Sequence, residues 1–190
     1  SKVEIEETEM VEYIRTAVVN NPSVKVWNLS QGTKTEVTDD SFSDFAIFLD
    51  SLQKEYGVLI CKSAGNQKHP ETGSLRIMQG ADSVRSLVVG SISHDKQDPS
   101  EGEINERSPF SRIGFGPEFL VKPDVVHYGG NMITGVQSFS FTGYQCSICK
   151  GTSFSTPRVT ALAASLGKAL SGDFNPLLIS VPLKSGPVKY

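Results

Sequence analysis

A serine at position 153 lies where a glycine-containing turn leads into an apolar segment, a placement suited to nucleophilic chemistry. The heptapeptide G-T-S-F-S-T-P at 151–157 runs directly into a mostly apolar stretch from Val159 to Leu170. This pattern predicts a helix that starts beside Ser153, with Pro157 in its first turn and Gly172 as its stop signal. The unpaired amides and positive dipole end of such a helix start would stabilise negative charge on a bound acyl group. Taken alone, the motif also fits a serine that only caps the helix.

Three further segments stand upstream of the heptapeptide, and together the four resemble the subtilisin-like serine peptidases, the subtilases. They are V-W-N-L-S-Q-G at 26–32, S-A-G-N at 63–66 and K-P-D-V-V at 122–126. In this order they resemble the family's substrate-binding strand, its oxyanion-hole turn and a segment that precedes the nucleophile loop. The resemblance implies a doubly wound, mainly parallel α/β sheet and peptide-bond hydrolysis through an acyl-enzyme on Ser153.

The resemblance also implies roles for the residues around the serine. Asn66 would donate its side-chain amide to the oxyanion together with the backbone N–H of Ser153. The substrate-binding residues would be Ser30, Gln31, Gly32, Ala64 and Gly65. The first three would pair with an extended peptide along a free sheet edge, and the last two would form the opposite wall of the pocket. Asn66 as a turn residue, and Ser30 to Gly32 as a plain strand end, remain the structural alternatives.

The base and the carboxylate of a Ser-His-Asp triad are not recognisable in this sequence. In the family they precede the substrate strand, in D-[S/T]-G and H-G-T motifs, whereas His69, His94 and His127 all follow it here. Asp82 is followed by a serine and then by a valine where glycine is required, so we reject it as the triad aspartate. We expect residues 1–190 to form a single partial domain, the C-terminal half of a subtilase catalytic domain that lacks its N-terminal part and is inactive alone. The alternatives are a pseudoprotease or peptide-binding module, and a half-site that another chain completes.

The composition limits the classes of partner that this chain is expected to bind. The chain has 190 residues, 38% of them hydrophobic and 21% charged, and a formal net charge of −3, which gives no general attraction to nucleic acid or anionic membranes. No apolar run approaches the roughly 20 residues of a membrane span. We expect a peptide or protein substrate, the missing half that carries Asp and His, and a second copy that pairs through the exposed sheet surface. No cofactor is expected; calcium follows from the resemblance only, with no ligands assigned. The family favours a location outside the cytoplasm, and an intracellular one stays open.

The cysteines are too few for a disulfide-built scaffold. Cys61 ends an apolar run and is expected in the core, whereas Cys146 and Cys149 form a single C-x-x-C pair just before the heptapeptide. For that pair, ordinary thiols, a local disulfide and a metal or redox role all remain open.

Apolar periodicity predicts the elements that position these residues. The expected elements are a helix around 10–18, a strand at 24–29, a helix from the N-cap candidates at 39–41 to Gly57, and strands at 58–61 and 87–89. Segments 91–121 and 127–150 are rich in glycine, serine and charge and are expected to be surface connections, and the tail at 172–190 is expected to lack a long helix.

Overall fold

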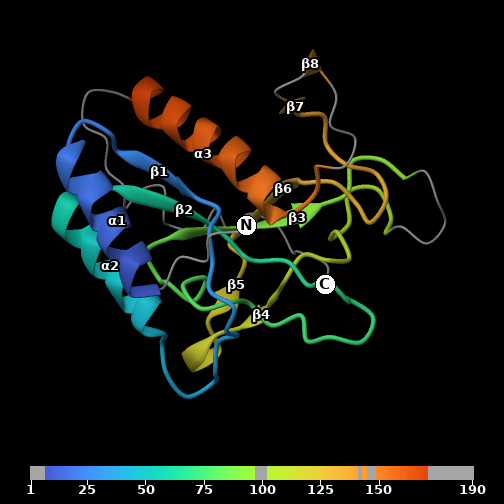
Figure 1. The fold of residues 1–190 in the computed structure, drawn as a ribbon, viewed down its shortest axis with the longest axis horizontal. Helices are drawn as coiled ribbons and strands as arrows, with labels where there is room; N and C mark the ends of the chain where they lie inside the picture. The colour runs from blue at the N-terminus through green and yellow to red at the C-terminus, as the bar shows by residue number, and fades with distance from the viewer. Residues whose placement is uncertain (1–6, 97–101, 141–142, 145–148, 171–190) are drawn as a thin grey trace.

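A four-stranded parallel sheet organises the chain in the computed structural model, which describes residues 7–96, 102–140, 143–144 and 149–170 (Figure 1). Its strands, in spatial order, are β1 (Val26–Leu29), β2 (Leu59–Ser63), β3 (Leu87–Ile92) and β6 (Val125–Tyr128). All three neighbouring pairs run parallel. The predicted α/β class with a mainly parallel sheet is therefore confirmed, and β1 is an outer strand of this sheet.

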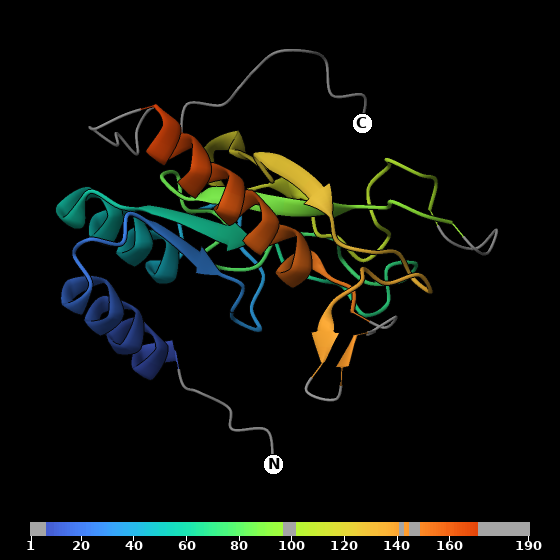
Figure 2. The same cartoon turned by 90° about the horizontal axis from the view of Figure 1, so that it is seen from above.

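Helices cover both faces of the sheet (Figure 2). Helices α1 (Glu7–Asn20) and α2 (Asp44–Tyr56) share a buried cluster with Ile60, whereas Leu59 and Cys61 pack against Ala163 of α3 (Thr152–Ala169). Successive side chains of a strand point to opposite faces, and both faces are covered here, so every residue of β2 is buried. Its sequence, L-I-C-K-S, is apolar except for Lys62 and Ser63. None of the described helices combines the length and apolar character that a membrane-spanning helix needs.

Helix α2 begins later than the sequence predicts. Its N-cap is Ser43, whose Oγ accepts a hydrogen bond from the backbone N–H of Ala46 at 3.2 Å, so the prediction of a cap at 39–41 is wrong. Asp82 fixes Ser43 as the N-cap residue. Its carboxylate accepts hydrogen bonds from the backbone N–H and the Oγ of Ser43 at 2.6 and 2.8 Å. The helix ends at Gly57 as predicted, with the glycine in the left-handed conformation (φ 59°).

The two segments expected to be surface connections contain regular structure, so that prediction is wrong in part. They hold strands β4 (Gly114–Phe115), β7 (Phe139–Ser140) and β8 (Gly143–Tyr144), the 3-10 helix η1 (Pro117–Phe119), the first residue of β5 (Val121–Lys122) and the second half of β6. Strand β6 is too short to show a period of its own and forms because Val125 pairs in register with Val89 of β3. The tail at 172–190 and the predicted stop at Gly172 lie outside the described residues.

Helix α3 begins at Thr152, with Gly151 as its N-cap residue at φ 137° and ψ 163°, a conformation that is essentially restricted to glycine. Ser153 is thus inside the first turn and is not the cap. Pro157 lies inside the helix and not in its first turn, which corrects the prediction.

Candidate active site

Ser153 lies against the end of β1 at the carboxyl edge of the sheet. Its Oγ donates a hydrogen bond to the backbone O of Ser30 at 3.3 Å, and Ser30 Oγ donates back to the backbone O of Ser153 at 3.3 Å. Pro157 explains the second bond: proline has no N–H, so the carbonyl four residues before it loses its usual helical donor. Ser30 supplies the replacement, and the first turn of α3 is thereby tied to the outer strand.

Asn66 is fixed beside the helix start by its side-chain carbonyl. Its Oδ1 accepts from the backbone N–H of Thr152 at 2.8 Å and from Thr152 Oγ1 at 3.2 Å. The Nδ2 end then faces Gly151, where an added Cβ would lie 3.1 Å from it. Asn66 is exposed, and its Nδ2 donates no hydrogen bond to any other described residue. The arrangement leaves an oriented amide donor next to the first turn of α3.

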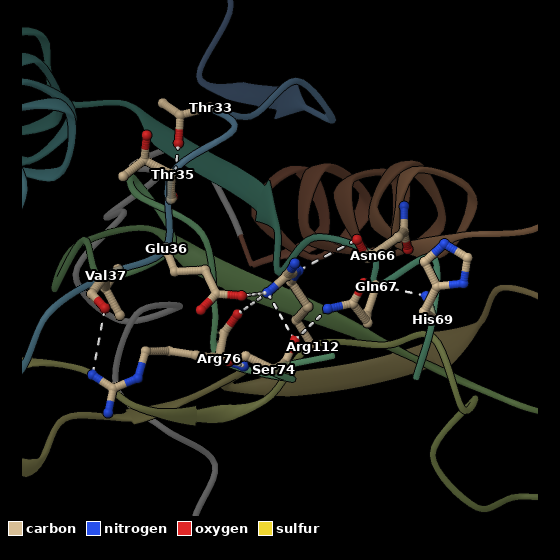
Figure 3. Close-up of polar contacts among 10 residues, drawn as sticks. All are labelled: Thr33, Thr35, Glu36, Val37, Asn66, Gln67, His69, Ser74, Arg76 and Arg112. Carbon is tan, nitrogen blue, oxygen red and sulfur yellow. Dashed lines mark hydrogen bonds and ion pairs between the residues drawn. The ribbon is translucent and has the colours of Figure 1, made fainter. Parts of the chain in front are cut away.

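Arg112 supports the turn formed by Gly65 and Asn66 (Figure 3). Its backbone N–H donates to the O of Gly65 at 3.2 Å, and its Nε donates to the O of Asn66 at 3.3 Å. Its Nη1 pairs with the Glu36 carboxylate and also donates to the carbonyl of Ser74 at 3.3 Å. Burial works against the ionised carboxylate, yet the hydrogen bonds from Arg112 and Ser74 and the Arg112 charge hold the pKa of Glu36 below its ordinary value.

The sequence reasoning missed Arg112. The only available signal was a cation within the F-S-R-I-G segment at 110–114, and nothing in that segment shows which turn the cation supports.

The predicted substrate-binding residues lie on two neighbouring chain segments. Leu29 of β1 is in register with Lys62 of β2, so Ser30, Gln31 and Gly32 leave the sheet beside the segment that holds Ala64 and Gly65. Gly65 (φ 99°) cannot be replaced without movement, because an added Cβ would come within 2.8 Å of Met78 Cγ. The structure therefore brings Ser30, Asn66 and Ser153 together at one edge, with the other predicted residues adjoining them in sequence.

Lys62 is a second residue that the sequence reasoning missed. Its side chain is 1% exposed, and its Nζ donates to the backbone O of Ser63 at 3.0 Å. Burial lowers the pKa of Lys62 to about 8, partly offset by the negative charge of Asp82. The sequence shows a lysine within an apolar segment, but it does not show toward which residues the lysine side chain points.

The histidines are held by other contacts. The backbone N–H of His69 donates to Gln67 Oε1 at 3.2 Å, and His94 lies against the ring of Tyr128. His127 Nδ1 accepts from the backbone N–H of Tyr128 at 2.7 Å, and burial together with the Arg158 charge lowers the pKa of His127. All three histidines lie in the described ranges, and none of them hydrogen-bonds to Ser153 there.

Two other predictions concern thiols and metals. Cys61 is buried in the core as expected, and burial raises its pKa to about 11. Cys146 lies outside the described residues, so the role of the pair with Cys149 stays a prediction. In the ranges that the structure describes, no group of three or more His, Cys, Asp or Glu side chains could hold a metal ion.

A parallel α/β sheet that presents a serine in the first turn of a helix, next to a fixed asparagine amide, has the architecture of a serine peptidase domain. The sequence matches the subtilase family, peptidase family S8, over residues 2–176, and the chain belongs to that family.

Solved structures of similar fold are proteases. The prenylagaramide maturation protease PagA has a TM-score of 0.60 at 19% identity, covering 95% of this chain and 57% of that one. The patellamide maturation protease PatA gives 0.60 at 19% identity (93% and 57% covered), and MycP1 with its N-terminal propeptide removed gives 0.58 at 21% (93% and 59%). Among curated proteins, an uncharacterized protein of Sinorhizobium fredii (strain NBRC 101917 / NGR234), y4bN, is 32% identical over 137 residues. That match covers 57% of this chain and 32% of y4bN, so the chain spans well under two thirds of the proteins it resembles.

Proposed function

We propose that this chain carries the nucleophile half of a subtilisin-type serine endopeptidase. Ser153 Oγ attacks the carbonyl of the scissile peptide bond, and the resulting acyl-enzyme is hydrolysed by water. Nδ2 of Asn66 and the backbone N–H of Ser153 donate to the oxyanion. The hydrogen bond from Thr152 N–H to Asn66 Oδ1 carries this proposal, because it turns the amide donor toward the helix start.

The proton of Ser153 needs an acceptor that the described residues do not supply. Ser153 Oγ now donates to the backbone O of Ser30, and a carbonyl cannot act as the base at neutral pH. In the proposed mechanism the base is a histidine and its orienting carboxylate an aspartate, both supplied from outside residues 1–190. The proteases of similar fold are longer than this chain, which leaves room for such a part.

Two exposed features support a docking surface for the segment that supplies the histidine. Strand β1 is an outer strand in the described sheet, and α3 exposes Leu162 (55%) and Leu166 (51%), which lie one turn apart. The end of β1 adjoins Ser153 through Ser30, and the two leucines lie further along the helix whose first turn contains Ser153. A histidine-bearing segment that packed here, from the same polypeptide or from another chain, would complete the site; a second copy of this chain is the competing occupant.

Hydrolysis of casein tests the proposal. The 190-residue chain alone should not hydrolyse casein, whereas the natural polypeptide that contains the Asp and His segments should, and its Ser153→Ala variant should be inactive. Turnover by the isolated chain that Ser153→Ala abolishes would reveal a base within it.

A peptide-binding module without catalysis remains the second candidate, favoured by the hydrogen bond that already engages Ser153 Oγ. Saturable peptide binding by a natural polypeptide that never reacts at Ser153 with a fluorophosphonate would establish it.

A further inference from the structure

The buried ammonium of Lys62 lies beside a candidate substrate-binding residue. Leu59 and Cys61 of β2 face α3, so the alternation of the strand sends Lys62 to the opposite face. From there the side chain extends toward the carboxyl edge of the sheet. A Cβ added at Gly32 would lie 3.6 Å from Lys62 Nζ, and no other described atom outside residues 31–33 lies within 4 Å of that position. The side of Gly32 on which a side chain would stand therefore faces the Lys62 ammonium.

The hydrogen-bonding capacity of this cation is only partly used. An ammonium group carries three N–H donors. Among the described residues, Lys62 Nζ donates one hydrogen bond, to the carbonyl of Ser63. A buried charge without a close partner of opposite sign is costly, and such groups are normally paired. Lys62 thus has unused donors at a place where a substrate backbone is expected to pass.

Asp82 is the acidic group that acts on Lys62, but it is committed elsewhere. Its two carboxylate oxygens accept from Ser43 N–H, Ser43 Oγ and Gly80 N–H, at 2.6, 2.8 and 2.8 Å. The ion pairs formed among the described residues do not include Lys62 with Asp82. Asp82 therefore offsets the charge at a distance and leaves the donors of Lys62 available.

We propose that Lys62 is a specificity-determining residue that binds an acidic substrate side chain next to Gly32, at the residue immediately before the cleaved bond. The inference rests on the proposed function, because it takes the segments 30–32 and 64–65 as the two walls that receive that side chain. A glutamate or aspartate carboxylate accepts hydrogen bonds from the ammonium and neutralises it, whereas the carbonyl of a neutral glutamine amide can accept a hydrogen bond but leaves the charge unpaired. The competing role for Lys62 is a purely structural counter-charge to Asp82.

Peptide binding to the Ser153→Ala variant separates the two roles without requiring catalysis. The probes are two acetylated tetrapeptide amides that differ only in a C-terminal Glu or Gln residue, titrated at pH 7 into protein with ¹³Cε-labelled lysines. We expect the Glu peptide to bind at least about tenfold more tightly and to shift the Lys62 signal, as a charged hydrogen bond in a buried site implies. Lys62→Met, added to the same variant, should bind both peptides equally. Lys54→Met, which removes an exposed lysine in the last turn of α2, should keep the preference.

Equal affinity for the two peptides, a preference that survives Lys62→Met, or no binding of either peptide would each overturn the proposal. Failure of the proposed function is recognised separately, by the absence of fluorophosphonate labelling of Ser153 in the natural polypeptide. Equal binding of both peptides alongside normal labelling would remove only the role of Lys62.

Discussion

Replacing Lys62 by methionine should remove a distinctive pH dependence of stability. Lys62 is buried, and its pKa falls from the ordinary 10.5 to about 8 in the folded protein. Between these two values the unfolded chain holds a proton that the folded chain has lost, so the free energy of unfolding rises with pH. The window of about 2.5 pH units, at about 1.4 kcal/mol per unit, gives a rise of about 3 kcal/mol.

Ionisation of Cys61 changes the free energy of unfolding in the opposite direction, over an overlapping pH range. Its pKa rises from 9.0 to about 11, mainly through burial, so the folded protein keeps a proton that the unfolded chain loses. Its contribution to stability is present below pH 9 and falls by about 3 kcal/mol as the pH rises toward 11. The wild-type protein should therefore gain on the order of 1 kcal/mol or less from pH 8 to pH 9 and then stay roughly level up to about pH 10.5.

Urea denaturation at a series of pH values measures these curves. Trp27 is the sole tryptophan, and it packs against the cluster between the sheet and the helices α1 and α2, so its fluorescence reports unfolding. The difference between wild type and Lys62→Met cancels the contribution of Cys61 and should rise by about 3 kcal/mol between pH 7 and pH 10.5. Lys54→Met serves as the exposed-lysine control and should run parallel to wild type. A flat difference curve for Lys62→Met would show that the lysine is not desolvated, and the argument built on its burial would fail.

Two further substitutions probe the support of the site. Gly151→Ala forces an unfavourable φ and brings a Cβ within 3.1 Å of Asn66 Nδ2; we expect a loss of about 1–3 kcal/mol in urea denaturation and a shifted Asn66 side-chain amide signal in NMR. Gly57→Ala is the control, since it shares a positive φ but has nothing within 4 Å, and it should leave the Asn66 signal in place. Because the folded pKa of Glu36 lies below its ordinary 4.5, its stabilising effect is present above that pH and is lost as the pH falls further. Glu36→Gln should flatten this acid-side loss in denaturation curves, whereas an unchanged acid slope would mean that the pair with Arg112 is not formed in solution.

The local sequence was enough for the longer elements of the N-terminal half and for the start of the helix that carries Ser153. Apolar runs predicted β2 and α1, and the G-T-S-F-S-T-P motif placed Ser153 at a helix start, because both signals depend on neighbours in sequence. The N-cap of α2 was missed because Ser43 is selected by Asp82, a residue 39 positions away. Strand β6 was missed for the same reason, since only its pairing with β3 defines it.

The supporting contacts of the site could not be predicted from spacing. The hydrogen bond from Thr152 to Asn66 joins residues 86 positions apart, and the pair of Arg112 with Glu36 joins residues 76 positions apart. Pro157 illustrates a subtler limit: a proline near a helix start favours the first turn, but the carbonyl that it leaves free is satisfied by Ser30, a partner that no local rule supplies.

The rate at which Ser153 reacts with a fluorophosphonate tests most directly whether Ser153 and Asn66 act together. In the natural polypeptide that contains this chain, the label should attach to Ser153, and Ser153→Ala should remain unlabelled. Asn66→Leu should slow the reaction by about 10²–10³, a magnitude known from subtilisin itself, a member of this family. Labelling of Asn66→Leu at the wild-type rate, or labelling confined to other residues, would contradict the assignment of this edge of the sheet as a nucleophile and oxyanion site.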